Sequence, residues 1–142
     1  MKVGPIDLKN VILCDDVRVE KSNKFILIGV YSANIVVSQT PAQLAVSLYG
    51  EALFSKPGEH RLSIRISVND TRLGELGIGY AITDTSEALG FHTPQFNIDI
   101  QGPSTLKIEA SADHENWKTI VDKRILVGEV PGSLLVATQS PA

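Results

Sequence analysis

Apolar and polar residues alternate along most of the chain. The clearest run is HRLSIRISV, residues 60–68, in which the aliphatic positions 62, 64, 66 and 68 alternate with arginine and serine. A period of two residues is typical of a strand with one face in the core and one in water. Runs of the same kind, separated by polar turns, predict strands at 11–20, 24–31, 34–38, 44–54, 60–68, 73–82, 96–101 and, as a closing hairpin, 104–127.

Only one segment predicts a helix, TDTSEALG at residues 83–90. Asp84 can cap its first turn, Glu87 follows three residues later as in a capping box, and Gly90 can end it. The pattern as a whole predicts an all-β protein, a single-domain antiparallel β-sandwich of immunoglobulin-like architecture, with a closed β-barrel as the alternative. We expect the sandwich over residues 1–130 and a C-terminal tail at 131–142.

Composition narrows the classes of function. A chain of 142 residues that is 43% hydrophobic suits one domain with a single core. Thirteen Lys and Arg against sixteen Asp and Glu form no basic run, so we expect no nucleic-acid partner. No apolar run approaches the roughly 20 residues that span a bilayer, and the first residues lack the apolar segment of a signal peptide. We therefore expect a cytoplasmic protein with no membrane partner.

One stretch carries a resemblance to a known family. The phrase ILCDDVRVE, followed by KFILIGVYSANIVV, Pro41 and Leu44, resembles the opening of a family of small bacterial proteins of unknown function and of about this length. The resemblance is specific over residues 12–44 and rests on the strand pattern beyond them. It implies a bacterial or phage origin and a β-rich single domain. It brings no activity, cofactor or catalytic residue to this chain.

Asp15 departs from the strand pattern, because counting by twos from Leu13 to Val17 places its carboxylate on the apolar face. Asp16 points to the opposite face of a regular strand, so the two carboxylates cannot act as an acid/base pair. A carboxylate on a covered face should accept backbone N–H groups or meet a cation. We interpret Asp15 as a structural residue, with a bound cation or catalysis as the alternatives.

Other polar candidates favour ordinary structural roles. The three histidines lack the close spacing of a metal site. Asp113, His114 and Glu115 could gather oxygens around a cation, but a hairpin loop is polar without one. Trp117 is interpreted as a structural residue that covers the core. Nucleotide, phosphate, hydrolase and metal motifs are missing, so we expect no catalytic residue, no cofactor and no metal ligand.

The strand of residues 25–31 is apolar on both faces. A sandwich strand buries only one face in its own core, so something else must cover the second. That second face, predicted to be an interface, consists of Ile26, Ile28 and Val30.

These features favour a non-enzymatic binding or assembly module, homo-oligomeric or docked on a larger partner protein. The tail residues Leu134–Ala137 are an alternative cover for the apolar face within one chain. A small-ligand binder, acting as a sponge or sensor, is the second hypothesis. An internal cavity of roughly 300 Å³ or more with converging polar groups would support it. A hydrolase built on Asp15 and a histidine is the third.

Overall fold

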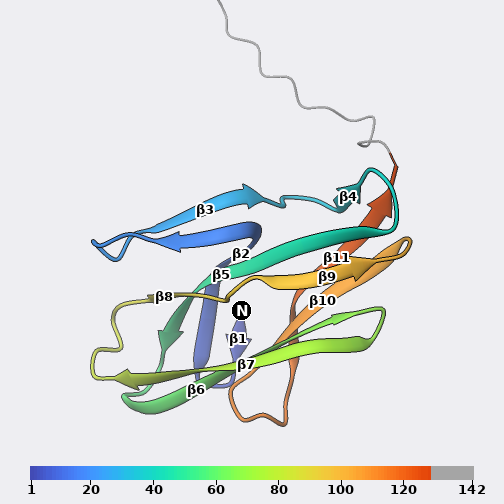
Figure 1. Cartoon of the computed structure of the whole chain (residues 1–142). Coiled ribbons are helices and arrows are strands. Elements are labelled where there is room, and N and C mark those ends of the chain that lie inside the picture. Colours follow the sequence, from blue (N-terminus) through green and yellow to red (C-terminus); the bar gives the residue numbers. More distant parts are fainter. Residues whose placement is uncertain (129–142) are drawn as a thin grey trace, which may run out of the picture.

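The computed structural model describes residues 1–128, and Figure 1 shows that they form two packed sheets. No strand of one sheet pairs with a strand of the other within this part of the chain, so the fold is a β-sandwich, not a closed barrel. The all-β prediction is confirmed. All strand pairs are antiparallel except one, the parallel pair of β4 (Ile35–Val37) and β11 (Lys118–Val127).

The first sheet has six strands and is built around two long ones. β2 and β5 contain 14 and 13 residues, and β2 bends at Asn10, where the pairing with β5 shifts its register and φ is 50°. A bulge of this kind strengthens the local twist, so the sheet curls. Its strands are β1 (Lys2–Val3), β2 (Ile6–Val19), β3 (Phe25–Val30), β5 (Ala42–Phe54), β8 (Leu89–His92) and β9 (Phe96–Ile100).

The second sheet has five strands, in the order β4-β11-β10-β6-β7. Its longest hairpin joins β6 to β7 through a tight turn at Asn69 and Asp70, where φ is 49° and 65°. Two consecutive residues with positive φ are what a two-residue hairpin turn requires. The strands are β4 (Ile35–Val37), β6 (Gly58–Val68), β7 (Thr71–Ile82), β10 (Ser104–Ser111) and β11 (Lys118–Val127).

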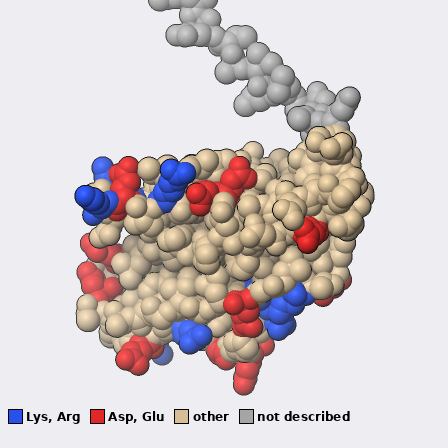
Figure 2. All heavy atoms as spheres, viewed as in Figure 1, with Lys and Arg blue, Asp and Glu red and all other residues tan. Residues whose placement is uncertain are grey.

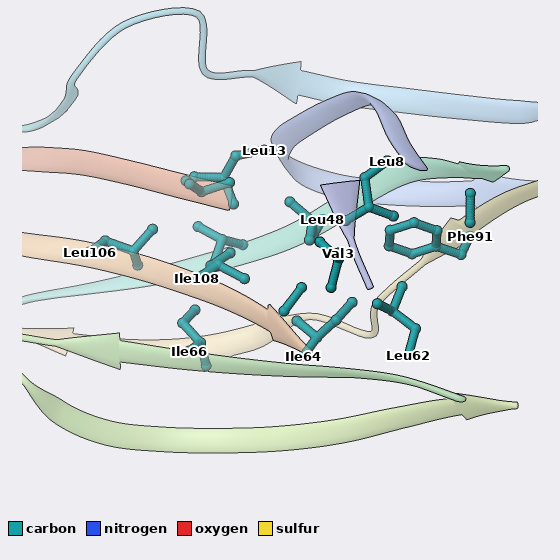
Figure 3. Close-up of a cluster of buried hydrophobic side chains, with 14 of the residues drawn as sticks. Val3, Leu8, Leu13, Leu48, Leu62, Ile64, Ile66, Phe91, Leu106 and Ile108 are labelled. Atoms are coloured by element: carbon teal, nitrogen blue, oxygen red, sulfur yellow. The ribbon is translucent and has the colours of Figure 1, made fainter. Parts of the chain in front are cut away.

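The core lies between the sheets and is filled by aliphatic side chains from both (Figure 3). These residues occupy alternate positions of their strands, as a period of two requires. Their burial supplies the main drive for folding, since each fully buried aliphatic side chain contributes about 1.5–3 kcal/mol. The labelled members of the cluster are Val3, Leu8, Leu13, Leu48, Leu62, Ile64, Ile66, Phe91, Leu106 and Ile108.

The prediction of a helix at residues 83–90 is wrong. The carboxylate of Asp84 does cap a turn, accepting the backbone N–H of Ser86 at 2.8 Å, but no helix follows. Leu89 and Gly90 instead begin β8, because they pair with Ala52 and Glu51 of β5. A one-turn helix has too little internal hydrogen bonding to compete with a sheet edge. The predicted tail at 131–142, with Leu134–Ala137, lies outside the described residues.

Candidate interaction surface

The β2–β3 hairpin leaves the sandwich and folds back over the outside of its own sheet. β2 pairs with β5 only as far as Cys14, and beyond that residue it pairs with β3 alone. The ring of Phe25 then lies against Tyr49, with 5.2 Å between ring centroids, and against His92, at 5.9 Å. Tyr49 points away from the core because its neighbour Leu48 points into it. One face of the hairpin therefore packs on β5 and β8 through Phe25. Figure 1 shows the hairpin running alongside β5.

Gly90 is the residue that lets this contact form. A Cβ at Gly90 would lie 2.6 Å from Cε2 of Phe25, closer than side-chain atoms approach one another. The sequence thus needs a glycine here for close packing, not for ending a helix.

The other face of the hairpin is the surface that the sequence predicted as an interface. Ile26, Ile28 and Val30 are 41%, 39% and 53% exposed. They lie beside Arg18, Asp16 and Cys14 of β2, their partners across the ladder. The Arg18 guanidinium and the Asp16 carboxylate lie 3.6 Å apart, so a charged pair flanks the aliphatic row. We call these three aliphatic residues the β3 outer face.

Charged side chains lie near this surface but not on β3 itself. In Figure 2, both signs gather at the end of the molecule where the hairpin turns, and further groups of both signs follow along the edge where the hairpin runs. β3 is also an edge strand, since it pairs with β2 and with no other strand of residues 1–128. Natural proteins usually protect such edges with charge, proline or a cover. β3 has no charged residue and no proline.

Asp15 sits where the hairpin leaves the sheet, and its carboxylate accepts a hydrogen bond from the hydroxyl of Tyr31 at 2.5 Å. The carboxylate lies directly over Gly29, where a Cβ would be 2.1 Å from Oδ2. Gly29 has φ of 67°, a left-handed conformation that favours glycine. The side chain of Gln95 donates to the backbone carbonyl of Asp15 at 2.8 Å and so ties the hairpin to the strand pair β5–β9.

The hydrogen bonds of Asp15 hold the hairpin in place against the first sheet. Burial raises the pKa of the Tyr31 phenol, and the hydrogen bond to Asp15 raises it further, so the hydroxyl stays protonated and donates. Burial also raises the pKa of the Cys14 thiol, which is fully buried and donates weakly to the carbonyls of Asp16 and Ser47. A thiol kept protonated in this way is a poor nucleophile.

The carboxylate of Asp113 is hydrogen-bonded within its own polar loop, residues 113–116. Asp113 accepts the backbone N–H groups of Glu115 and Asn116 at 2.9 and 2.8 Å, and these bonds hold its pKa well below the usual range. In residues 1–128 there is no group of three or more His, Cys, Asp or Glu side chains placed to hold a metal ion. His114 is turned toward Glu75 of β7.

Trp117 lies on the outside of the second sheet instead of over the core. The guanidinium of Arg65 stacks on its ring at 3.9 Å from the centroid, and Glu109 holds that guanidinium through two bonds of 3.0 and 3.3 Å. Arg65 points outward because Ile64 and Ile66 point into the core. The indole therefore covers a charged residue of the outer face.

A hollow of about 370 Å³ lies between the hairpin and β11, next to Val30 and Tyr31. The loops at residues 55–59, 83–95 and 112–117, which a small-ligand binder with this sequence is expected to use, do not line it. Lys123 does line it, and sequence reasoning missed this residue. The signal was present, because Lys123 shares the parity of Val121 and Ile125, which are buried.

The match to a family model covers residues 9–121, about four-fifths of the chain, and includes residues 14–30, over which β2 and β3 pair. The chain belongs to a family of unknown function, DUF6941. The family resemblance seen in the opening strands is thereby confirmed. No curated protein is similar enough to this DUF6941 member to count as a match. The part of the chain that the structure describes contains no helix with the length and apolar character needed to cross a bilayer.

Proposed function

We propose that the protein is a non-enzymatic assembly module that associates with a second copy of itself through the β3 outer face. The observation that carries this proposal is the exposure of Ile26, Ile28 and Val30 on a hairpin whose other face packs on the first sheet through Phe25. An exposed aliphatic row on an unprotected edge strand is typical of an interaction site.

The free energy that burial of the β3 outer face can contribute to association is moderate. Fully burying an aliphatic side chain contributes about 1.5–3 kcal/mol, and these three are already about half covered, so each gains a part of that amount on association. Such a surface suits a contact between copies that depends on protein concentration.

A second copy fits this surface better than an acidic or basic partner does. The flanking strip on β2 presents Asp16 and Arg18 next to each other, one charge of each sign. A two-fold contact brings the same patch together from both sides, so Asp16 of each copy can face Arg18 of the other. A surface with paired opposite charges is complementary to itself.

The test is light scattering coupled to size exclusion at several protein concentrations. The wild type is expected to associate at high micromolar concentration, and Ile28→Lys is expected to be monomeric because it places a charge in the centre of the apolar row. Leu73→Lys is the matched control, since Leu73 is 46% exposed on β7 of the other sheet and the change is chemically similar. The control should associate as the wild type does.

A truncation after Val130 separates the two ways of covering the face. If the wild type is monomeric at high micromolar concentration and only the truncation associates, the segment after Val130 is the cover and the proposal is wrong. Association of the wild type, of the truncation and of Leu73→Lys, but not of Ile28→Lys, supports contact between copies.

A further inference from the structure

The hollow beside the hairpin lies at the seam between the two sheets. On one side are β2 and the residues that follow β3, and on the other is the first half of β11. Val11, Tyr31 and Ile120 are partly buried residues that pack on the core and line this hollow. Its volume of about 370 Å³ falls within the range of small-molecule sites, and six of its ten lining residues are aliphatic.

Lys123 gives the hollow a charge. In the ladder of β10 and β11 it pairs with Leu106, which is fully buried, so the lysine leaves β11 on the core-facing side. It is half-buried, and its ammonium donates to the backbone carbonyl of Ala33 at 3.0 Å. A lysine in this position is unusual, because the residues on either side of it along that face, Val121 and Ile125, are buried aliphatics.

The ammonium of Lys123 has donors to spare. Of the ion pairs formed within residues 1–128, none includes Lys123. An ammonium carries three N–H donors and the carbonyl of Ala33 accepts from one, so two remain for a ligand. The exposed hydroxyl of Ser32 lies on the rim of the same hollow and can donate to the same ligand.

We infer that this hollow binds a small amphipathic carboxylate. Its apolar body lies against Val11, Val30 and Ile120, and its carboxylate meets the ammonium of Lys123. Burial of the apolar body contributes affinity, while the charge-assisted hydrogen bonds select an anion over a neutral or cationic head group. Asp122 also lines the hollow and is exposed, and its negative charge disfavours an anion near it, so the ligand's head group is confined to the Lys123 side.

The probes are octanoate, octanol and octylammonium, each titrated below its micelle-forming concentration into labelled protein and followed by NMR. Octanoate is expected to shift the methyl signals of Val11, Val30 and Ile120 and to show intermolecular contacts to them. Octanol should bind about fivefold to tenfold more weakly and octylammonium more weakly still. These wild-type titrations need no variant and settle whether the hollow is the site.

Two lysine variants test the role of the charge. Lys123→Gln should reduce octanoate affinity to that of octanol. Lys118→Gln is the matched control, since Lys118 is on the same strand and also donates to a backbone carbonyl, that of Lys2 at 3.2 Å, but does not line the hollow. It should leave octanoate affinity unchanged. The titrations are repeated on Ile28→Lys, so the result does not depend on association between copies.

Several results would overturn the inference. One is a wild type that does not bind octanoate. A second is binding that shifts only signals outside the hollow, and a third is octylammonium binding as tightly as octanoate. Equal octanoate affinities of Lys123→Gln and the wild type would also refute it, as would equal losses in the two lysine variants. If Lys123→Gln fails to fold, the wild-type titrations alone decide.

Discussion

The two hairpins β2–β3 and β6–β7 are built from similar strand patterns, but their outer faces differ in chemistry. Each is antiparallel and places an edge strand at the limit of its sheet. The outer face of β6 carries Arg61 and Arg65, and Arg65 is held by Glu109 and covered by Trp117. The outer face of β3 carries only aliphatic side chains, exposed by 39–53%.

The comparison shows that position in the fold, not strand pattern alone, decides what an outer face needs. The β6–β7 hairpin stays in its sheet, so its inner face fills the core and its outer face meets water. The β2–β3 hairpin turns out of its sheet at Cys14 and uses its inner face to cover β5 and β8. Its second face is then a row of three apolar side chains that the rest of residues 1–128 leaves partly exposed.

The largest expected effect is a loss of stability on replacing Gly29 of the edge strand β3, compared with Gly79 of the edge strand β7. Gly29→Ala should destabilise the fold by roughly 2–4 kcal/mol, because a non-glycine residue is strained at a φ of 67° and its Cβ would displace the Asp15 carboxylate. Gly79→Ala on β7 should change stability by less than about 1 kcal/mol, since nothing lies within 4 Å of the added Cβ. Urea melts of the two variants measure this difference. Equal losses of stability would contradict the special role of Gly29 in the β2–β3 hairpin.

The next effect concerns the hydrogen bond that fixes the hairpin. Asp15→Ala is expected to cost roughly 1–3 kcal/mol, because it leaves the partly buried hydroxyl of Tyr31 without its acceptor. Asp15→Asn should recover only part of this loss, since a bond to a neutral amide is weaker than one to a carboxylate. Tyr31→Phe removes the other partner. The double variant Asp15→Ala, Tyr31→Phe should lose less than the sum of the single losses, and strict additivity in denaturant melts would show that the two residues do not interact.

Much of the fold was predictable because period-two patterning is local. The alternation at 60–68 and the placement of Asp15 with Leu13 and Val17 follow from the pleat of a strand alone. The partner of Asp15 was not predictable, because the hydrogen bond to Tyr31 depends on the left-handed residue Gly29, which bends the hairpin.

The failed helix has the same cause. Asp84, Glu87 and Gly90 satisfy the local signals of a short helix, but Gly90 is required by the ring of Phe25, 65 positions earlier in the chain. Sequence periodicity reports which side of a strand faces in. It does not report that a hairpin folds back on the outer side of its own sheet, which is the feature that creates both the β3 outer face and the hollow at Lys123.

The smallest expected effect on stability is that of replacing Tyr80 of the β6–β7 hairpin, in comparison with Tyr31 next to β3. Tyr31 donates to Asp15, whereas the buried hydroxyl of Tyr80 on β7 has no hydrogen-bond partner among residues 1–128. Tyr80→Phe should therefore leave stability unchanged at neutral pH or raise it by up to about 1 kcal/mol, because it removes a buried polar group that gains nothing in return. Tyr31→Phe should lower stability at the same pH.

Alkaline pH sharpens this last contrast. Burial raises the pKa of Tyr80 to about 12 from an ordinary value of 10.0. The folded protein therefore holds the phenol proton more tightly than the unfolded chain does, and the stability that this contributes is complete below pH 10 and is lost as the pH rises toward 12. Tyr80→Phe lacks this loss, so its advantage over the wild type should grow between pH 8 and pH 11 in urea melts. A wild type and variant that lose stability in parallel over that range would show that the Tyr80 hydroxyl reaches water in the folded protein.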